Sequence, residues 1–205
     1  MKASEKIRKM NFTVIATVIA LSLIIVGPAK AITWGWPDDN LHPNVGAMVV
    51  DWPDDGLSQV CSGTLIAVED LQGRVFLTAG HCTDYLEYLI DSGQIGIDDI
   101  YVNFDEDALN ESTLLPVAAV ETHPDYTSFR ARSNVYDVGL LLLEADAGII
   151  PATLPEEGFL DDLRKDGELR KGKDEADFAV VGYGGILDWP PPEMRWEGKR
   201  RYAFS

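Results

Sequence analysis

Basic residues are scarce in this 205-residue sequence, where 17 lysines and arginines stand against 34 aspartates and glutamates and the net charge is −17. A surface with this charge repels phosphates, so we expect no nucleic-acid partner. The acids are spread through turn-like segments rather than gathered in a tail (Asp38-Asp39, Asp54-Asp55, Asp98-Asp99, Asp161-Asp162). This spread favours a solvated, soluble surface, and a high-salt habitat is the alternative.

Long apolar runs are also few. Residues 12–26 form such a run, which follows a positively charged start and precedes Ala29-Lys30-Ala31. This order is typical of a secretory signal peptide over residues 1–31, cleaved after Ala31. The run is short for a membrane span, which disfavours an uncleaved anchor. We therefore expect a secreted, extracellular protein (periplasmic in a host with two membranes) without stable membrane association after cleavage.

Cysteine is equally rare, with only Cys61 and Cys82 in the sequence. Two cysteines in an exported chain are expected to form a disulfide, whereas in the cytosol they would stay reduced. A metal site made of Cys61, Cys82 and His81 is the alternative use, but no fourth ligand follows at a suitable spacing. We expect a disulfide, and no metal or other cofactor.

Short segments rich in Val, Ile, Leu and Phe recur between residues 32 and 153, each bounded by Gly, Pro, Asp or Ser. This pattern predicts strands at residues 44–50, 59–67, 73–79, 100–104, 113–121 and 138–143. Strands at this spacing favour an all-β closed barrel or sandwich over alternating strands and helices. The consecutive leucines at 140–143 predict a strand that is buried on both faces.

The composition changes over residues 154–177, where charged residues dominate. Phe159, Leu160 and Leu163 have helical spacing and predict one short amphipathic helix. We interpret this segment as a charged connector between two halves. Beyond it, residues 178–183 and 199–204 are further strand candidates, separated by a loop that contains three consecutive prolines.

Two short runs carry candidate chemical groups. The first is Thr78-Ala79-Gly80-His81-Cys82. A disulfide to Cys61 would pin the loop that bears His81, and closing such a loop is worth about 3 kcal/mol by chain entropy. The second run is Tyr136-Asp137-Val138-Gly139-Leu140, in which an acid opens an apolar strand. A buried acid needs a partner, and a histidine N–H is a natural one. Taken singly, each residue also fits a structural role, as a core histidine or as an aspartate in a turn.

Together these runs resemble the histidine and aspartate motifs of the chymotrypsin/trypsin family of serine proteases, in the family's order. The resemblance extends from about residue 32 to the end through Ile32-Thr33-Trp34-Gly35, Cys61-Ser62-Gly63-Thr64-Leu65-Ile66, His123-Pro124-Asp125-Tyr126 and Val181-Gly182-Tyr183-Gly184. It implies a trypsin-like double β-barrel, with the first barrel (32–153) complete and the second (178–205) only partly present. It also implies a polypeptide substrate, His81 as general base, and Asp137 as the residue that holds the imidazole tautomer.

The nucleophile of that family, in a Gly-Asp-Ser-Gly-Gly motif, does not occur in the 205 residues. Asp91-Ser92-Gly93 lies between His81 and Asp137 without the flanking glycines, Ser62 belongs to a strand motif, and Ser205 is the last residue. None of these serines is expected to be the nucleophile. We therefore expect a serine endopeptidase chain that stops before its serine segment, is inactive as it stands and folds poorly alone. A non-catalytic, protease-like binding module is the alternative.

Overall fold

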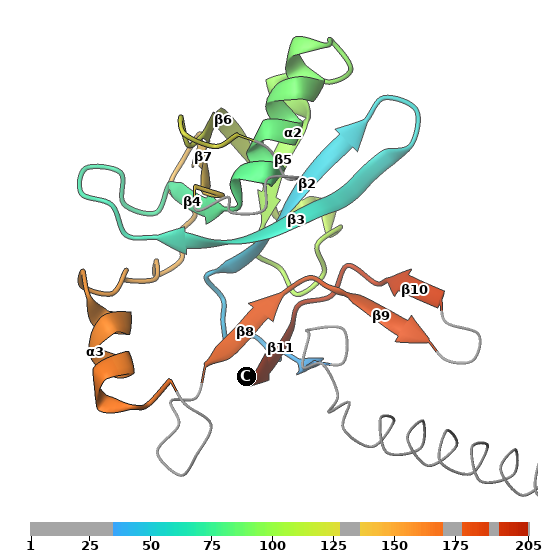
Figure 1. Cartoon of the computed structure of the whole chain (residues 1–205). Helices are drawn as coiled ribbons and strands as arrows, with labels where there is room; N and C mark the ends of the chain where they lie inside the picture. The colour runs from blue at the N-terminus through green and yellow to red at the C-terminus, as the bar shows by residue number, and fades with distance from the viewer. Residues whose placement is uncertain (1–34, 128–135, 170–177, 189–192, 205) are drawn as a thin grey trace, which may run out of the picture. The chain divides into compact units, whose positions relative to one another are not determined.

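Six antiparallel strands close into a barrel in the computed structural model, which describes residues 35–127, 136–169, 178–188 and 193–204. The order around the barrel is β2-β3-β4-β7-β6-β5, and β5 pairs with β2 to close it (Figure 1). The strands are β2 Val45–Trp52, β3 Gly56–Ile66, β4 Val75–Thr78, β5 Ile100–Asn103, β6 Leu114–Thr122 and β7 Gly139–Leu143. Each overlaps a segment that the sequence predicts, and the barrel rather than the sandwich is the architecture.

Strand β2 is buried on both faces, whereas β7 is not. Met48 of β2 belongs to the barrel core, and its neighbour Val49 packs with Tyr183 outside the barrel. In β7 Leu141 is fully buried, but Leu140 is 37% exposed. The prediction that residues 140–143 are buried on both faces is therefore wrong. A run of leucines does not reveal which strand of a barrel receives a second layer, and here that strand is β2.

One helix of the barrel was not predicted. Helix α2 (Gly80–Asp91) follows β4 directly and packs against β6 and β7. Its buried Cys82, Leu86 and Leu89 recur at helical spacing, which is the signal that identifies this helix. Two short 3₁₀ turns, η2 (Ile97–Asp99) and η3 (Glu111–Thr113), directly precede β5 and β6.

A smaller sheet joins segments from opposite parts of the sequence. Strand β1 (Trp36–Pro37) pairs with β11 (Arg201–Phe204), which pairs with β8 (Ala179–Gly182). Strands β8 and β11 confirm the two late strand candidates. The hairpin of β9 (Gly185–Asp188) and β10 (Glu193–Trp196) was not predicted, because both strands are short and prolines separate them.

Helix α3 (Phe159–Asp166) confirms the predicted short helix. Glycines in the left-handed region flank it, with φ of 88° at Gly158 and 84° at Gly167. Its apolar Phe159 and Leu160 are 47% and 55% exposed. The described residues therefore do not bury the apolar face of α3.

Hydrogen bonds of the Arg200 side chain connect the smaller sheet to the barrel. Its side chain is fully buried, its Nε lies 2.8 Å from Oδ2 of Asp38, and its Nη1 donates to the carbonyl oxygens of Val45 and Phe104. Burial acts to raise the pKa of Asp38, but hydrogen bonds from His42 and Arg200 outweigh burial and lower the pKa overall. The ion pair is thus charged at neutral pH.

Several predictions concern residues outside the described ranges. The signal peptide (1–31), the end of the charged connector (170–177) and the proline loop (189–192) are among them. The boundaries of the two barrels, at 32–153 and 178–205, stay predictions. Within the described ranges, no helix is long and apolar enough to cross a membrane.

Candidate active site

Pairing of β4 with β7 brings His81 and Asp137 together across 56 positions of the sequence. Thr78, the last residue of β4, lies opposite Gly139, the first residue of β7. His81 comes three positions after Thr78, and Asp137 comes two positions before Gly139, so both lie at the same end of the strand pair. Nδ1 of His81 lies 2.9 Å from Oδ2 and 3.2 Å from Oδ1 of Asp137.

Asp137 also caps helix α2. Ala79 at the N-cap position provides no side-chain acceptor for the first N–H groups of the helix. The N–H of His81 donates to Oδ1 of Asp137 at 2.7 Å, and the backbone of Gly80 bonds the same carboxylate. A helix N-terminus favours a negative charge at this place. The carboxylate is therefore positioned independently of the imidazole that it holds.

The carboxylate of Asp137 is partly solvated. The side chains of His81 and Asp137 are 39% and 37% exposed, so the expectation of a buried acid is wrong. Burial acts to raise the pKa of Asp137, but hydrogen bonds from the ring and backbone of His81 outweigh it and lower the pKa overall. Asp137 is an anion at neutral pH and faces the imidazole as a hydrogen-bond acceptor.

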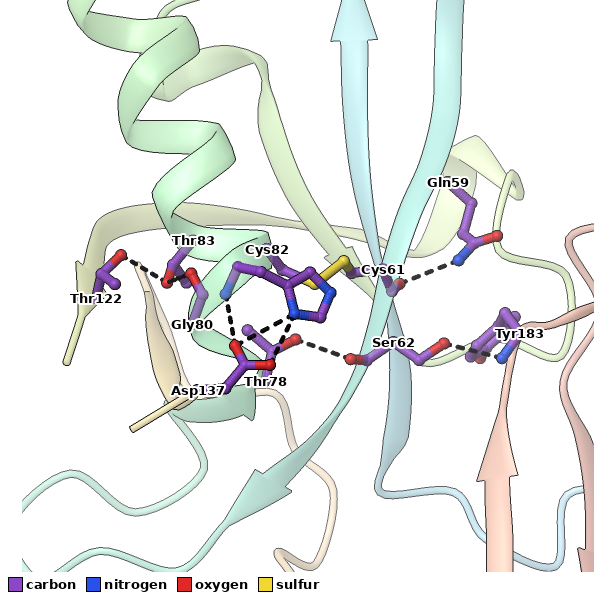
Figure 2. Close-up of a disulfide and its surroundings, with 11 residues drawn as sticks. Gln59, Cys61, Ser62, Thr78, Gly80, Cys82, Thr83, Thr122, Asp137 and Tyr183 are labelled. Atoms are coloured by element: carbon purple, nitrogen blue, oxygen red, sulfur yellow. Dashed lines mark hydrogen bonds and ion pairs between the residues drawn. A yellow bond between two sulfur atoms is a disulfide. The ribbon is translucent and has the colours of Figure 1, made fainter. Parts of the chain in front are cut away.

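Gly139 allows β7 to approach the first turn of α2 closely. A Cβ at this position would lie 2.3 Å from Oγ1 of Thr83. Thr83 is fully buried; its hydroxyl donates to the carbonyl oxygen of Gly80 at 3.1 Å and accepts from Thr122 at 2.7 Å (Figure 2). This contact fixes the distance between the strand that leads from Asp137 and the helix that carries His81.

The predicted disulfide between Cys61 and Cys82 is confirmed, and it ties β3 to α2 beside His81. Next to it, the carbonyl oxygen of Ser62 accepts from Oγ1 of Thr78 at 2.8 Å. The hydroxyl of Ser62 accepts from the N–H of Tyr183 at 2.9 Å, as Figure 2 shows. Ser62 thus links the barrel to the residue that follows β8.

Ser92 lies at the opposite end of α2 from His81. It is the C-cap residue of this 12-residue helix, and its hydroxyl donates to the carbonyl oxygen of Leu89. A helix of this length is about 18 Å long. The Asp91-Ser92-Gly93 run is therefore remote from the imidazole, as expected. Ser205 lies outside the described residues.

The pair is arranged for proton transfer. A carboxylate beside Nδ1 of His81 favours the tautomer with the proton on Nδ1, which leaves the lone pair on Nε2. Such an imidazole can take a proton from a hydroxyl and return it later. Cys61, Cys82 and His81 also bring three potential metal donors together, although both sulfurs are engaged in the disulfide.

No family model and no curated protein matches the sequence. In structure the chain is similar to neuropsin, a serine protease expressed in the limbic system of mouse brain, with a TM-score of 0.50 and 17% sequence identity. The chain has part of the trypsin fold. The similarity covers 82% of this chain and 60% of the neuropsin chain, so the chain spans less than two thirds of that protease. The part that it spans includes the closed six-strand barrel.

Thr83, Thr122 and Gly139 belong to the surroundings of the pair and were not predicted. A weak signal exists for Gly139, since a glycine interrupts an otherwise apolar strand directly after the aspartate motif. Thr83 and Thr122 have no comparable signal. They meet only because α2 packs across the end of β6.

Proposed function

We propose that this chain carries the acid–base half of a secreted, trypsin-like serine endopeptidase, with His81 as general base and Asp137 as its orienting partner. The observation that supports the proposal is the 2.9 Å contact between Nδ1 of His81 and Oδ2 of Asp137, made by a carboxylate that helix α2 holds in place. The trypsin fold of the barrel and the disulfide beside His81 agree with a protease that works outside the cell.

In the proposed reaction, Nε2 of His81 takes the proton of a serine hydroxyl as its oxygen attacks the carbonyl carbon of a peptide bond. Asp137 stabilises the imidazolium that forms. The imidazolium then protonates the leaving amine, and an acyl-enzyme remains. Water, activated by the same imidazole, hydrolyses the acyl-enzyme and regenerates the serine.

The serine of this reaction is proposed to come from outside the 205 residues, because they contain no Gly-Asp-Ser-Gly-Gly motif. Since the groups that shape an oxyanion hole accompany that serine in proteases of this kind, we propose that the 205 residues alone are inactive. A fluorophosphonate probe, which labels activated serines, should leave the 205-residue chain unlabelled.

The decisive experiment starts from the transcript beyond codon 205. The longest reading frame is expressed and assayed for casein hydrolysis. His81→Ala should lower the rate by about 10³-fold or more. Gln94→Ala is the control, since it removes an exposed side chain beyond the far end of α2, and it should leave the rate unchanged. Equal rates for wild type and His81→Ala would show that His81 is not the base.

A non-catalytic binding module is the second candidate, and the missing serine motif is the observation that favours it. Such a module needs no further chain to work. It should unfold cooperatively in urea as a 205-residue protein, and its transcript should contain no serine motif in any frame. A frame with that motif would instead support the protease.

A further inference from the structure

Three potential metal donors cluster beside the His81–Asp137 pair. The sulfur atoms of Cys61 and Cys82 and an imidazole nitrogen of His81 lie within 4.8 Å of one another. Cys61 lies on β3, and the other two lie in the first turn of α2, so two well-packed elements hold the cluster. The disulfide engages both sulfurs, and reduction would release them as thiols.

The spacing of the backbone suits an ion shared by the released thiolates. Two thiolates that bind one tetrahedral Zn²⁺ at about 2.3 Å lie about 3.8 Å apart. The Cα atoms of Cys61 and Cys82 are 6.4 Å apart, which leaves room for rotation about the side-chain bonds to reach this separation. A water molecule can fill the fourth position, as in zinc sites with three protein ligands.

Asp137 lies on the Nδ1 side of the His81 ring, where it can act as the hydrogen-bond partner of a metal-binding histidine. Histidines that bind zinc commonly donate their second ring N–H to a carboxylate, which fixes the tautomer and raises the basicity of the metal-binding nitrogen. Nδ1 of His81 already faces Asp137 at 2.9 Å. The lone pair for a metal is therefore on Nε2.

We propose that the reduced chain binds a thiophilic divalent ion, Zn²⁺ above all, through the thiolates of Cys61 and Cys82 and Nε2 of His81. The reductant is one dithiol or two molecules of a monothiol, which give two electrons and two protons to the Cys61–Cys82 bond and are themselves oxidised to a disulfide. The ion then displaces one proton from each cysteine thiol.

One consequence rests on the proposed function. The metal would occupy the lone pair with which His81 takes the proton of a serine, so the reduced, zinc-loaded chain could not act as a protease. A disulfide oxidant that takes two electrons from the two thiolates, and is itself reduced to thiols, would re-form the Cys61–Cys82 bond, release the ion and leave His81 able to act as the base again. The proposed protease activity is therefore inhibited by the bound ion in a reducing cytosol, and it returns in the oxidising environment outside the cell.

Cobalt is the probe for this site, because thiolate-bound Co²⁺ gives charge-transfer bands in the near ultraviolet and strong visible bands in tetrahedral coordination. The 205-residue chain is reduced with a phosphine under argon and titrated with Co²⁺, and the near-UV circular dichroism of its tryptophans reports the fold in the same sample. We expect a single bound Co²⁺ in the reduced chain and none in the oxidised chain.

Variants assign the ligands. His81→Ala should weaken Co²⁺ binding at least tenfold, and Asp137→Asn should weaken it by about tenfold to a hundredfold. The control Gln94→Ala, at an exposed residue beyond the far end of α2, should bind as wild type does. Binding by His81→Ala with wild-type affinity would overturn the proposal, since the thiolates alone would then hold the ion.

Folding of the reduced chain is part of the test. If reduction abolishes the near-UV signal and Co²⁺ restores it, metal binding and folding are coupled at this site, which supports the proposal. If the signal is lost and Co²⁺ neither binds nor restores it, the proposal is wrong. Neither result bears on catalysis, because casein hydrolysis is measured on the oxidised protein.

Discussion

The carboxylate of Asp137 serves two neighbours at once. It accepts from the ring of His81, and its Oδ1 accepts from the backbone N–H of the same residue at 2.7 Å. The second bond belongs to the N-terminus of α2 and exists whatever the protonation state of the ring. A change at this carboxylate therefore acts on the imidazole and on the helix together.

Acid should weaken the fold through Asp137. Burial acts to raise the pKa of Asp137, but hydrogen bonds from His81 bring it overall below the unfolded value of about 3.9. The native state thus binds fewer protons, and the stabilisation is complete above about pH 5 and disappears as the pH falls through the unfolded and then the folded pKa. Because solvent screens this partly exposed group, we expect an effect on the order of 1 kcal/mol.

Urea unfolding between about pH 6 and pH 2.5 measures this effect. Asp137→Asn should show a smaller loss of unfolding free energy over that range than wild type does. The exposed Asp125→Asn, which removes a carboxylate from a turn after β6, should keep the wild-type dependence. A wild-type pH dependence in Asp137→Asn would contradict the assignment.

His81 and Asp137 could be predicted from the sequence because each lies in a distinctive run of residues and their order is informative. The exposure of Asp137 could not. An acid before an apolar strand looks buried in a sequence, and only the fold leaves its side chain 37% exposed at the end of the β4–β7 pair.

Among the elements, the contact between β7 and α2 controls the geometry of the pair. Gly139 is the closest point of this contact, since a Cβ there would lie 2.3 Å from Oγ1 and 2.6 Å from Cγ2 of Thr83. Neither atom can move away easily, because Thr83 is fully buried and bonded to Gly80 and Thr122. With a threonine at residue 83, β7 and α2 can therefore pack this closely only if residue 139 is a glycine.

Gly139→Ala should destabilise the protein by about 1–3 kcal/mol through overpacking. Thr83→Ala removes the two nearest atoms, while the carbonyl oxygen of Ala79 stays 3.0 Å from the added Cβ, and it costs about 1 kcal/mol by itself. The double variant should therefore be more stable than the sum of the two single changes allows, and a double-mutant cycle in urea measures the difference. Gly96→Ala is the control, because residue 96 has an ordinary φ of −99° and a Cβ there meets nothing closer than 3.6 Å. Strictly additive costs would show that the two positions do not compete for space.

The strands of the barrel could be predicted because each is a short apolar segment between turn residues. Helix α2 was not predicted because its first turn, Gly80-His81-Cys82, reads as a loop, although Cys82, Leu86 and Leu89 have helical spacing. The hairpin of β9 and β10 escaped because strands of four residues beside prolines have little pattern of their own. Helix α2 depends on packing against β6 and β7, far along the chain, and the local pattern does not reveal these partners.

At the scale of the whole molecule, a buried charge network connects the smaller sheet to the barrel. Arg200 precedes β11 and pairs with Asp38, 162 positions earlier, just after β1. Tyr183 lies against the same guanidinium, and burial raises the pKa of its hydroxyl to about 12. The sequence could not predict this role, because the pattern of residues 199–204 predicts a strand but does not show that the fold buries Arg200.

Replacing Arg200 tests how strongly this network holds the sheet. Arg200→Met leaves the fully buried carboxylate of Asp38 without its guanidinium, and it deprives the carbonyl oxygens of Val45 and Phe104 of a donor. Breaking a buried ion pair in this way costs about 3–5 kcal/mol. Urea unfolding followed by tryptophan fluorescence measures the loss.

The neighbouring Lys199 provides a matched control. It forms an ion pair with Asp107 at 2.7 Å, but both side chains are about half exposed. Lys199→Met should therefore cost at most about 1 kcal/mol. Asp38→Asn added to Arg200→Met should recover part of the stability, because a neutral amide is cheaper to bury than a carboxylate that keeps only its hydrogen bonds with His42. If Arg200→Met is no more harmful than Lys199→Met, other contacts, such as that of Tyr183 with Ser62, hold the smaller sheet to the barrel, and the buried charge is dispensable.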